Sequence, residues 1–144
     1  MKFWDSSALV PLLVTQSTST AIRAIATSDP EMFVWWAAEV ECSSALIRLR
    51  RELVLAADGA KSGFEKLKRL AERWDEIEPS ETLRETAIRF LRVHPLRAAD
   101  AMQLAAAFVA ADGRPSSLEV VTLDDRLSEA ARKEGFMLID VPAN

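Results

Sequence analysis

The sequence predicts an α/β fold in which helices cover both faces of a parallel β-sheet. Short apolar segments typical of buried strands alternate with longer segments whose apolar residues recur every three or four positions, as in amphipathic helices. Parallel strands need a crossover of about a dozen residues, usually a helix, so strands that alternate with helices pair in parallel. With 144 residues, 49% of them hydrophobic, the chain is expected to form a single domain over residues 1–144.

The first part of the chain is expected to contain two strands and two short helices. An apolar strand over residues 1–4 stops at Asp5, and the two serines that follow suit the start of a helix that ends near residue 13. A second helix is expected over residues 18–26, closed by a Ser-Asp-Pro sequence, and a compact apolar run predicts a strand over residues 32–36.

The middle of the chain predicts a pair of longer helices. Helical spacing of apolar residues extends over 38–56, where Asp58-Gly59 is expected to end the helix, and resumes over 62–74. Residues 77–79 are expected to form a brief edge strand, because proline is tolerated at the edge or the end of a sheet.

The last part of the chain predicts two helices followed by two strands with a helix between them. Ser80 resembles a helix start, and His94-Pro95 breaks that helix. His94 stands alone in this turn and is interpreted as having no metal or catalytic role. Four further elements are expected: a helix around Asp100 that ends at 112–115, a strand over 118–123, a helix over 126–134 and a strand over 136–139.

Composition excludes several classes of protein. The net charge of -4 and the isoelectric point near 5.1 argue against a general basic surface for nucleic acid, although a local basic patch or metal ions would still allow binding. One cysteine, Cys42, excludes an internal disulfide and is compatible with the cytoplasm, where we expect the protein. No apolar run approaches the ~20 residues of a membrane span, no secretory signal is evident, and no Walker A, GxGxxG, paired CxxC or GxSxG motif occurs.

Three aspartates occupy unusual positions. Asp5 and Asp124 each follow a strand-like run, and ligands of open α/β sheets bind at the carboxyl ends of the strands. Asp100 lies in a helix that is apolar on nearly all sides, which predicts a buried carboxylate that is costly unless it is paired or binds a metal. The pattern predicts that these acids converge on one anionic site.

Each acid also has a purely structural interpretation. Asp5 and Asp124 are both placed to cap the helix that follows, Asp100 lies where a helix dipole favours an acid, and Glu39 and Glu41 are typical of a solvated helix face. If the acids do converge, they raise one another's pKa, and a divalent cation with oxygen ligands is the usual compensation. Such an ion activates water and stabilises charge on a phosphate, which suits phosphodiester hydrolysis.

Four segments, in this order and spacing, resemble the motifs of PIN-domain ribonucleases. They are FWDSSALV at residues 3–10, VECSSALIRL at 40–49, AADAMQLA at 98–105 and VTLDDRL at 121–127. The resemblance covers nearly the whole chain. Among PIN domains, the chain most resembles VapC-type toxins of toxin–antitoxin pairs, because it is a short single domain.

The resemblance implies a three-layer α/β/α fold and Mg²⁺- or Mn²⁺-dependent cleavage of RNA. It also implies a homodimer inhibited by a cognate antitoxin. Leu9, Leu12, Leu13 and the helix from Ala38 are candidate walls of a groove for that partner or, equally, part of the core. Carried over by motif, the catalytic and metal-binding acids are Asp5, Glu41, Asp100 and Asp124, and the supporting hydroxyls belong to Ser6 and Thr122.

Two neighbouring acids make the assignment ambiguous. Asp125 competes with Asp124, and Glu39 competes with Glu41. Glu39 and Glu41 lie roughly 200° apart on a helical wheel, so only one of them can face the site, and the wheel alone slightly favours Glu39. The motif register favours Glu41, because Ala45 and Leu46 follow it by about one helical turn.

The sequence is compatible with three other functions. A haloacid-dehalogenase-like phosphatase also has an aspartate after its first strand, but its Asp-x-Asp pattern is not met, because position 7 is Ser7. A catalytically silent PIN scaffold that only binds a partner is disfavoured by retention of all four acids. A housekeeping PIN nuclease differs from a toxin by having no antitoxin encoded beside it.

Overall fold

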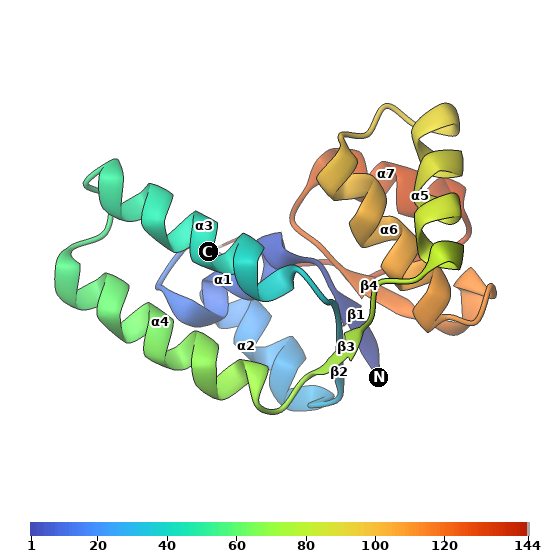
Figure 1. Ribbon diagram of the computed structural model, residues 1–144. Helices are drawn as coiled ribbons and strands as arrows, with labels where there is room; N and C mark the ends of the chain where they lie inside the picture. Colours follow the sequence, from blue (N-terminus) through green and yellow to red (C-terminus); the bar gives the residue numbers. More distant parts are fainter. Residues whose placement is uncertain (144) are drawn as a thin grey trace.

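A computed structural model describes residues 1–143, which fold around one five-stranded sheet (Figure 1). The strand order is β3-β2-β1-β4-β5, and every pairing is parallel. The strands are β1 (Lys2–Trp4), β2 (Met32–Trp35), β3 (Asp75–Ile77), β4 (Glu119–Val121) and β5 (Met137–Leu138). The first strand of the chain is therefore the central strand of the sheet.

The central strand sends alternate side chains into two separate cores. Phe3 packs with Val120 against one group of helices, whereas Trp4 packs with Val121 against the other. Both aromatic rings are almost fully inaccessible to solvent, at 1% and 0% exposure. Successive strand residues point to opposite faces, so a continuous apolar run at this position requires helices on both sides.

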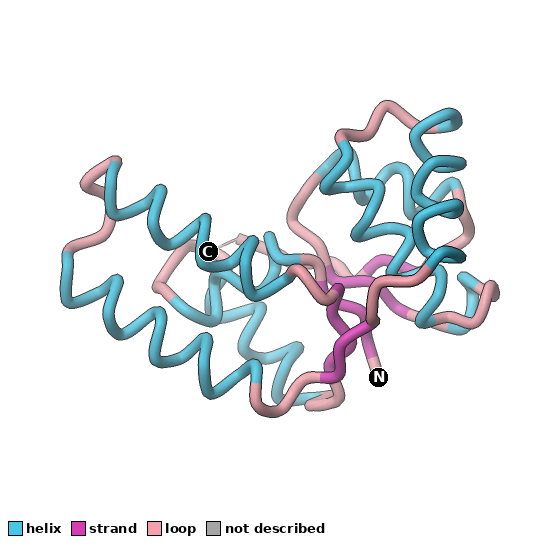
Figure 2. The backbone as a smooth tube through the Cα atoms, viewed as in Figure 1, coloured by secondary structure: helices cyan, strands magenta, loops and turns pink. Residues whose placement is uncertain are grey.

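Two groups of helices supply these layers (Figure 2). One core is lined by α1 (Ser6–Leu13), α2 (Ser19–Ser28), α3 (Ala38–Arg51) and α4 (Ala57–Ala71). The other is lined by α5 (Glu81–Val93), α6 (Ala98–Ala110) and α7 (Asp125–Lys133). The predicted three-layer α/β/α architecture is confirmed, and Cys42 is buried in the first of these cores.

The junction between α3 and α4 differs from the prediction. Helix α3 ends at Arg51, where Leu53 adopts a left-handed conformation and the Leu49 carbonyl accepts backbone hydrogen bonds from Val54 and Leu55. Helix ends of this kind usually carry glycine, and a leucine gives no such signal. The expected stop at Gly59 is wrong, because Gly59 lies inside α4.

Strand ends and one strand position also differ from the expectation. The third strand lies at Asp75–Ile77, immediately after the buried Trp74, rather than at residues 77–79. Strands β4 and β5 are shorter than the apolar runs that predicted them. Within residues 1–143, no helix combines the length and the apolar character needed to cross a membrane.

Candidate active site at the carboxyl edge of the sheet

The site begins where the central strand β1 and its neighbour β4 end. Asp5 follows β1, and Thr122 and Asp124 follow β4, which is paired in parallel with β1. Parallel register therefore brings residues more than a hundred positions apart to one edge of the sheet. Helices α3 and α6 bring Glu41 and Asp100 to the same edge, where Gln103 of α6 donates a hydrogen bond to Glu41. The charge of Asp124 acts on Asp5 and Asp100, and the charges of Asp5 and Asp100 act on Glu41.

Asp5 is the most buried of these acids, at 5% exposure. Its Oδ2 accepts hydrogen bonds from Ser7 Oγ at 2.5 Å and from Thr122 Oγ1 at 2.9 Å. Burial raises the pKa of Asp5, the two hydroxyl donors oppose that rise, and the charge of Asp124 adds to it. Asp5 does not cap α1 with its side chain, so its cap interpretation is not met.

The hydroxyl that supports Asp5 belongs to Ser7, a residue that the sequence interpretation did not assign to the site. Ser7 Oγ also accepts the backbone N–H of Leu123 at 2.9 Å, and Thr122 Oγ1 accepts that of Asp124 at 3.1 Å. These two hydroxyls tie the end of β1 to the loop after β4. The hydroxyl of Ser6 instead interacts with Glu41 and lowers its pKa.

Glu41 faces the site, and Glu39 faces solvent. The Glu41 carboxylate accepts a hydrogen bond from Gln103 Nε2 at 2.8 Å, whereas Glu39 is exposed. Burial is the main cause that raises the pKa of Glu41 to about 7, and the charges of Asp5 and Asp100 raise it further. The arrangement agrees with the motif register and not with the helical wheel.

Gln103 is a site residue that the sequence interpretation missed. It lies on α6 at 1% exposure, its amide donates to Glu41, and its Oε1 is buried without a hydrogen-bond partner among residues 1–143. A glutamine inside an otherwise apolar helix was the available signal, because a buried polar side chain needs a partner.

Asp100 is half-buried, so the expectation of a deeply buried carboxylate is wrong. Helix α6 begins at Ala98, its first two residues are exposed, and its fully buried stretch starts only at Ala101. The Asp100 carboxylate accepts the backbone N–H of Arg97 at 3.4 Å. Burial raises the pKa of Asp100, followed by the charge of Asp124.

Asp124 combines a structural role with a position in the site. Its Oδ1 caps α7 by accepting the backbone N–H of Leu127 at 2.8 Å. Asp100 and Asp124 share an open cleft of about 490 Å³, which is lined by Arg97, Ala99, Asp100, Asp124, Asp125 and Arg126. Asp125 is exposed at the first position of α7, so the cleft contains both competing aspartates.

The donor set is composed of carboxylate oxygens, which are hard ligands suited to Mg²⁺ or Mn²⁺. Within residues 1–143, no three His, Cys, Asp or Glu side chains form a ready-made cage for one ion. Mg²⁺ does not require such a cage, because it usually keeps several waters and binds through one or two carboxylates together with substrate phosphates. Burial, followed by the charge of a neighbouring acid, raises the pKa values of Asp5, Glu41 and Asp100, which fits a site that a cation would stabilise.

Comparison with known proteins agrees with this architecture. The chain resembles the crystal structure of FitAcB from Neisseria gonorrhoeae, with a TM-score of 0.66, 18% identity and coverage of 97% of each chain. It resembles PAE2754 from Pyrobaculum aerophilum with a TM-score of 0.67 and 21% identity, over 95% of this chain and 89% of the other. A toxin–antitoxin complex from Klebsiella pneumoniae matches with a TM-score of 0.60 and 14% identity, over 86% of this chain and 87% of the other.

These structural similarities lie below the identity at which function transfers, and they support the fold. No curated protein sequence matches the chain significantly. The PIN domain family model, in contrast, matches residues 2–133, from the first strand to the last residue of α7. The chain therefore belongs to the PIN domain family.

Proposed function

We propose that this protein is a metal-dependent endoribonuclease and the toxin of a type II toxin–antitoxin pair. The observation that carries the proposal is the convergence of Asp5, Glu41, Asp100 and Asp124 from four separate segments on one edge of the sheet. Such a concentration of negative charge repels a phosphodiester until a cation neutralises it. Bound Mg²⁺ or Mn²⁺ supplies an activated water and stabilises the charge that develops on phosphate.

The residues of the chain divide the remaining work. Asp5 and Glu41 are oriented by hydrogen bonds, Asp5 by the hydroxyls of Ser7 and Thr122 and Glu41 by the amide of Gln103. Asp100 and Asp124 line the open cleft, where a substrate has access. We assign the metal to these four acids.

Cleavage of RNA by the purified protein tests the proposal. We expect activity with Mg²⁺ or Mn²⁺ and none in EDTA. Asp100→Asn and Glu41→Gln should lose most activity, whereas the matched control Glu39→Gln should keep it, because Glu39 faces solvent. Undiminished cleavage in EDTA, or by folded Asp100→Asn, would refute the metal mechanism.

The assignment as a toxin requires an antitoxin, and the chain offers a surface for one. A pocket of about 610 Å³ between α1, α2 and α4 has apolar walls that include Leu12, Leu13 and Trp74. Four cations surround it, and none of them forms a salt bridge within the described residues: Arg23, Lys66, Arg69 and Arg73. Apolar walls with a cationic rim favour an acidic amphipathic segment of the antitoxin.

Co-expression tests the partner. A small reading frame beside the gene should encode a protein that co-purifies with this chain and suppresses its toxicity in the cytoplasm. The double substitution Arg69→Glu with Arg73→Glu should abolish co-purification, while the control Arg92→Glu on the opposite helical layer should not. Harmless overexpression of an active nuclease with no adjacent small frame would favour a housekeeping PIN nuclease.

We also propose that the chain forms a homodimer. Light scattering of the purified chain should give the mass of a homodimer.

A further inference from the structure

Two arginines lie at the N-termini of helices, where positive charge is unfavourable. Arg97 is the N-cap residue of α6, and Arg126 is the second residue of α7. A cation at a helix N-terminus opposes the helix dipole, at a cost of about 0.3–1 kcal/mol for an exposed residue. Neither guanidinium forms a salt bridge with any residue in 1–143. Helix stability therefore gives no reason for either position.

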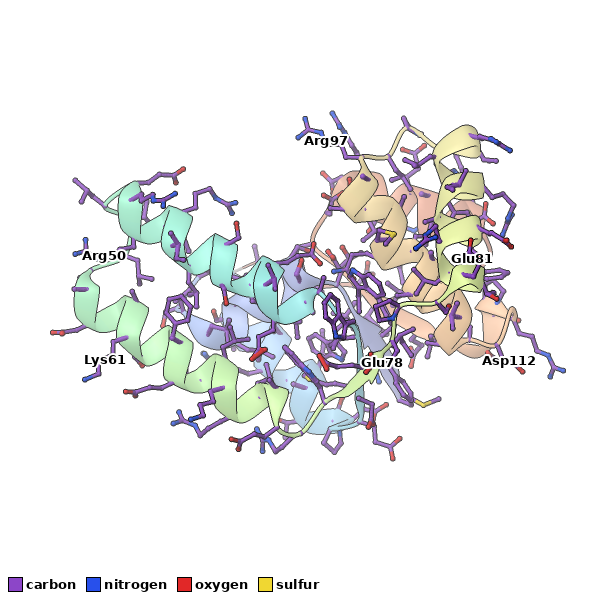
Figure 3. All side chains as sticks on the ribbon, viewed as in Figure 1. Arg50, Lys61, Glu78, Glu81, Arg97 and Asp112 are labelled. Carbon is purple, nitrogen blue, oxygen red and sulfur yellow. The ribbon has the colours of Figure 1, made fainter. Side chains whose placement is uncertain are left out.

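Both arginines line the cleft that contains Asp100 and Asp124, two of the four acids assigned to the metal. Arg97, Asp100, Asp124 and Arg126 all belong to its walls. Their shared place in the cleft puts both side chains near Asp100, where their positive charges oppose the rise in its pKa. Figure 3 shows Arg97 projecting outward at the start of α6, and Arg126 is exposed as well. Both guanidinium groups are therefore accessible to a ligand that enters the cleft.

We propose that Arg97 and Arg126 bind backbone phosphates of single-stranded RNA on either side of the scissile phosphate. The inference rests on the proposed nuclease function and adds a substrate-binding role for two residues outside the acidic quartet. Guanidinium groups bind phosphate through two parallel hydrogen bonds, and a protein of net charge -4 needs local cations to attract RNA. With one arginine on α6 and one on α7, a strand in the cleft is held over Asp100 and Asp124.

A purely electrostatic role toward Asp100 is the competing explanation, and it predicts different measurements. If the arginines only moderate the charge of Asp100, their removal changes the response to Mg²⁺ and leaves the salt dependence of RNA binding unchanged. If they contact phosphates, their removal lowers that salt dependence. Each phosphate contact contributes about 0.7 to the slope of log affinity against log salt for single strands.

The experiment measures fluorescence anisotropy of a short labelled single-stranded RNA over a range of salt concentrations. All proteins carry Asp5→Asn so that the RNA stays intact. Arg97→Ala and Arg126→Ala should each weaken binding about fivefold at ~0.1 M salt and reduce the slope by about 0.7, and the double variant should combine both losses. Arg92→Ala and Arg132→Ala serve as matched controls and should change binding less than about twofold. Both are exposed arginines that lie in the last turn of a helix, α5 and α7 respectively, and outside the walls of the cleft.

The outcomes separate this inference from the proposed function. Unchanged slopes for both cleft variants, or equal losses for the controls, would overturn the inference while wild-type cleavage of RNA still supports a nuclease. Absence of both RNA binding by the Asp5→Asn parent and metal-dependent cleavage by the wild type would overturn the two together. Thermal stabilisation of the wild-type chain by Mg²⁺ should persist in Arg97→Ala and Arg126→Ala, because neither residue is assigned to the metal.

Discussion

Replacing Glu41 by glutamine should make the stability of the metal-free protein less dependent on pH. Burial and the charges of Asp5 and Asp100 raise the pKa of Glu41 from 4.5 to about 7 in the folded chain. The folded protein therefore holds this proton more tightly than the unfolded protein does. The contribution of Glu41 to stability is complete below pH 4.5 and is lost as the pH rises through about 7.

The size of the effect follows from the difference between the two pKa values. A change from 4.5 to about 7 corresponds to about 3.4 kcal/mol, at roughly 1.36 kcal/mol per pKa unit. Solvent screens a partly exposed carboxylate, so we expect about 2 kcal/mol. Glutamine has no ionised form, so the Glu41→Gln protein should avoid this loss of stability.

Urea unfolding in EDTA between pH ~5 and ~8 measures the effect. The free energy of unfolding of the wild type should fall relative to that of Glu41→Gln by about 2 kcal/mol over this range. Glu39→Gln is the matched control, because Glu39 is exposed two residues away, and it should follow the wild type. Parallel curves for the wild type and Glu41→Gln would show that Glu41 is not held in a low-dielectric, acidic site.

Three further substitutions test the contacts around the acids. Ser7→Ala should cost about 1–3 kcal/mol in denaturant unfolding, because it removes the acceptor of the Leu123 N–H; an unchanged midpoint would contradict this. Asp100→Asn should raise the melting temperature of the metal-free protein slightly and abolish stabilisation by Mg²⁺, and a clear fall would assign Asp100 a structural role. Gln103→Leu should keep the protein folded but reduce cleavage, because Glu41 loses its donor, and full activity would contradict a positioning role.

The layered fold was predictable because its signals are local. Phe3 and Trp4 form an apolar run too short for a helix, and in the sheet each fills a different core. The same run explains why β1 is central, since only a strand covered on both faces buries consecutive aromatic rings. From that placement, Asp5 had to lie at the carboxyl edge of the sheet.

Two failures share one physical cause, which is that tertiary contacts decide where a helical pattern starts and stops. Leu53 ends α3 in a left-handed conformation that its sequence does not favour, and Gly59 continues α4 although glycine is a common helix stop. At Asp100, the apolar neighbours are buried by the sheet and by α5, while the first turn of α6 lies beyond them.

The choice between adjacent candidates depended on helical phase, which a sequence fixes poorly. One residue along a helix turns a side chain by about 100°, so the exact start of α1 at Ser6 decides that Ser7, and not Ser6, reaches Asp5. The same sensitivity separates Glu41 from Glu39. There the PIN motif gave the correct helical phase, because it extends over the full helical turn from Glu41 to Ala45.

The competition between helix cap and site residue was a false alternative for Asp124. A carboxylate has two oxygens, and the cap of α7 uses Oδ1 alone. Capping fixes the side-chain rotamer, and a fixed rotamer presents the remaining oxygen in one direction. The structural role of Asp124 therefore orients it within the cleft that it shares with Asp100. For an acid between a strand and a helix, evidence for a cap does not count against a place in the site.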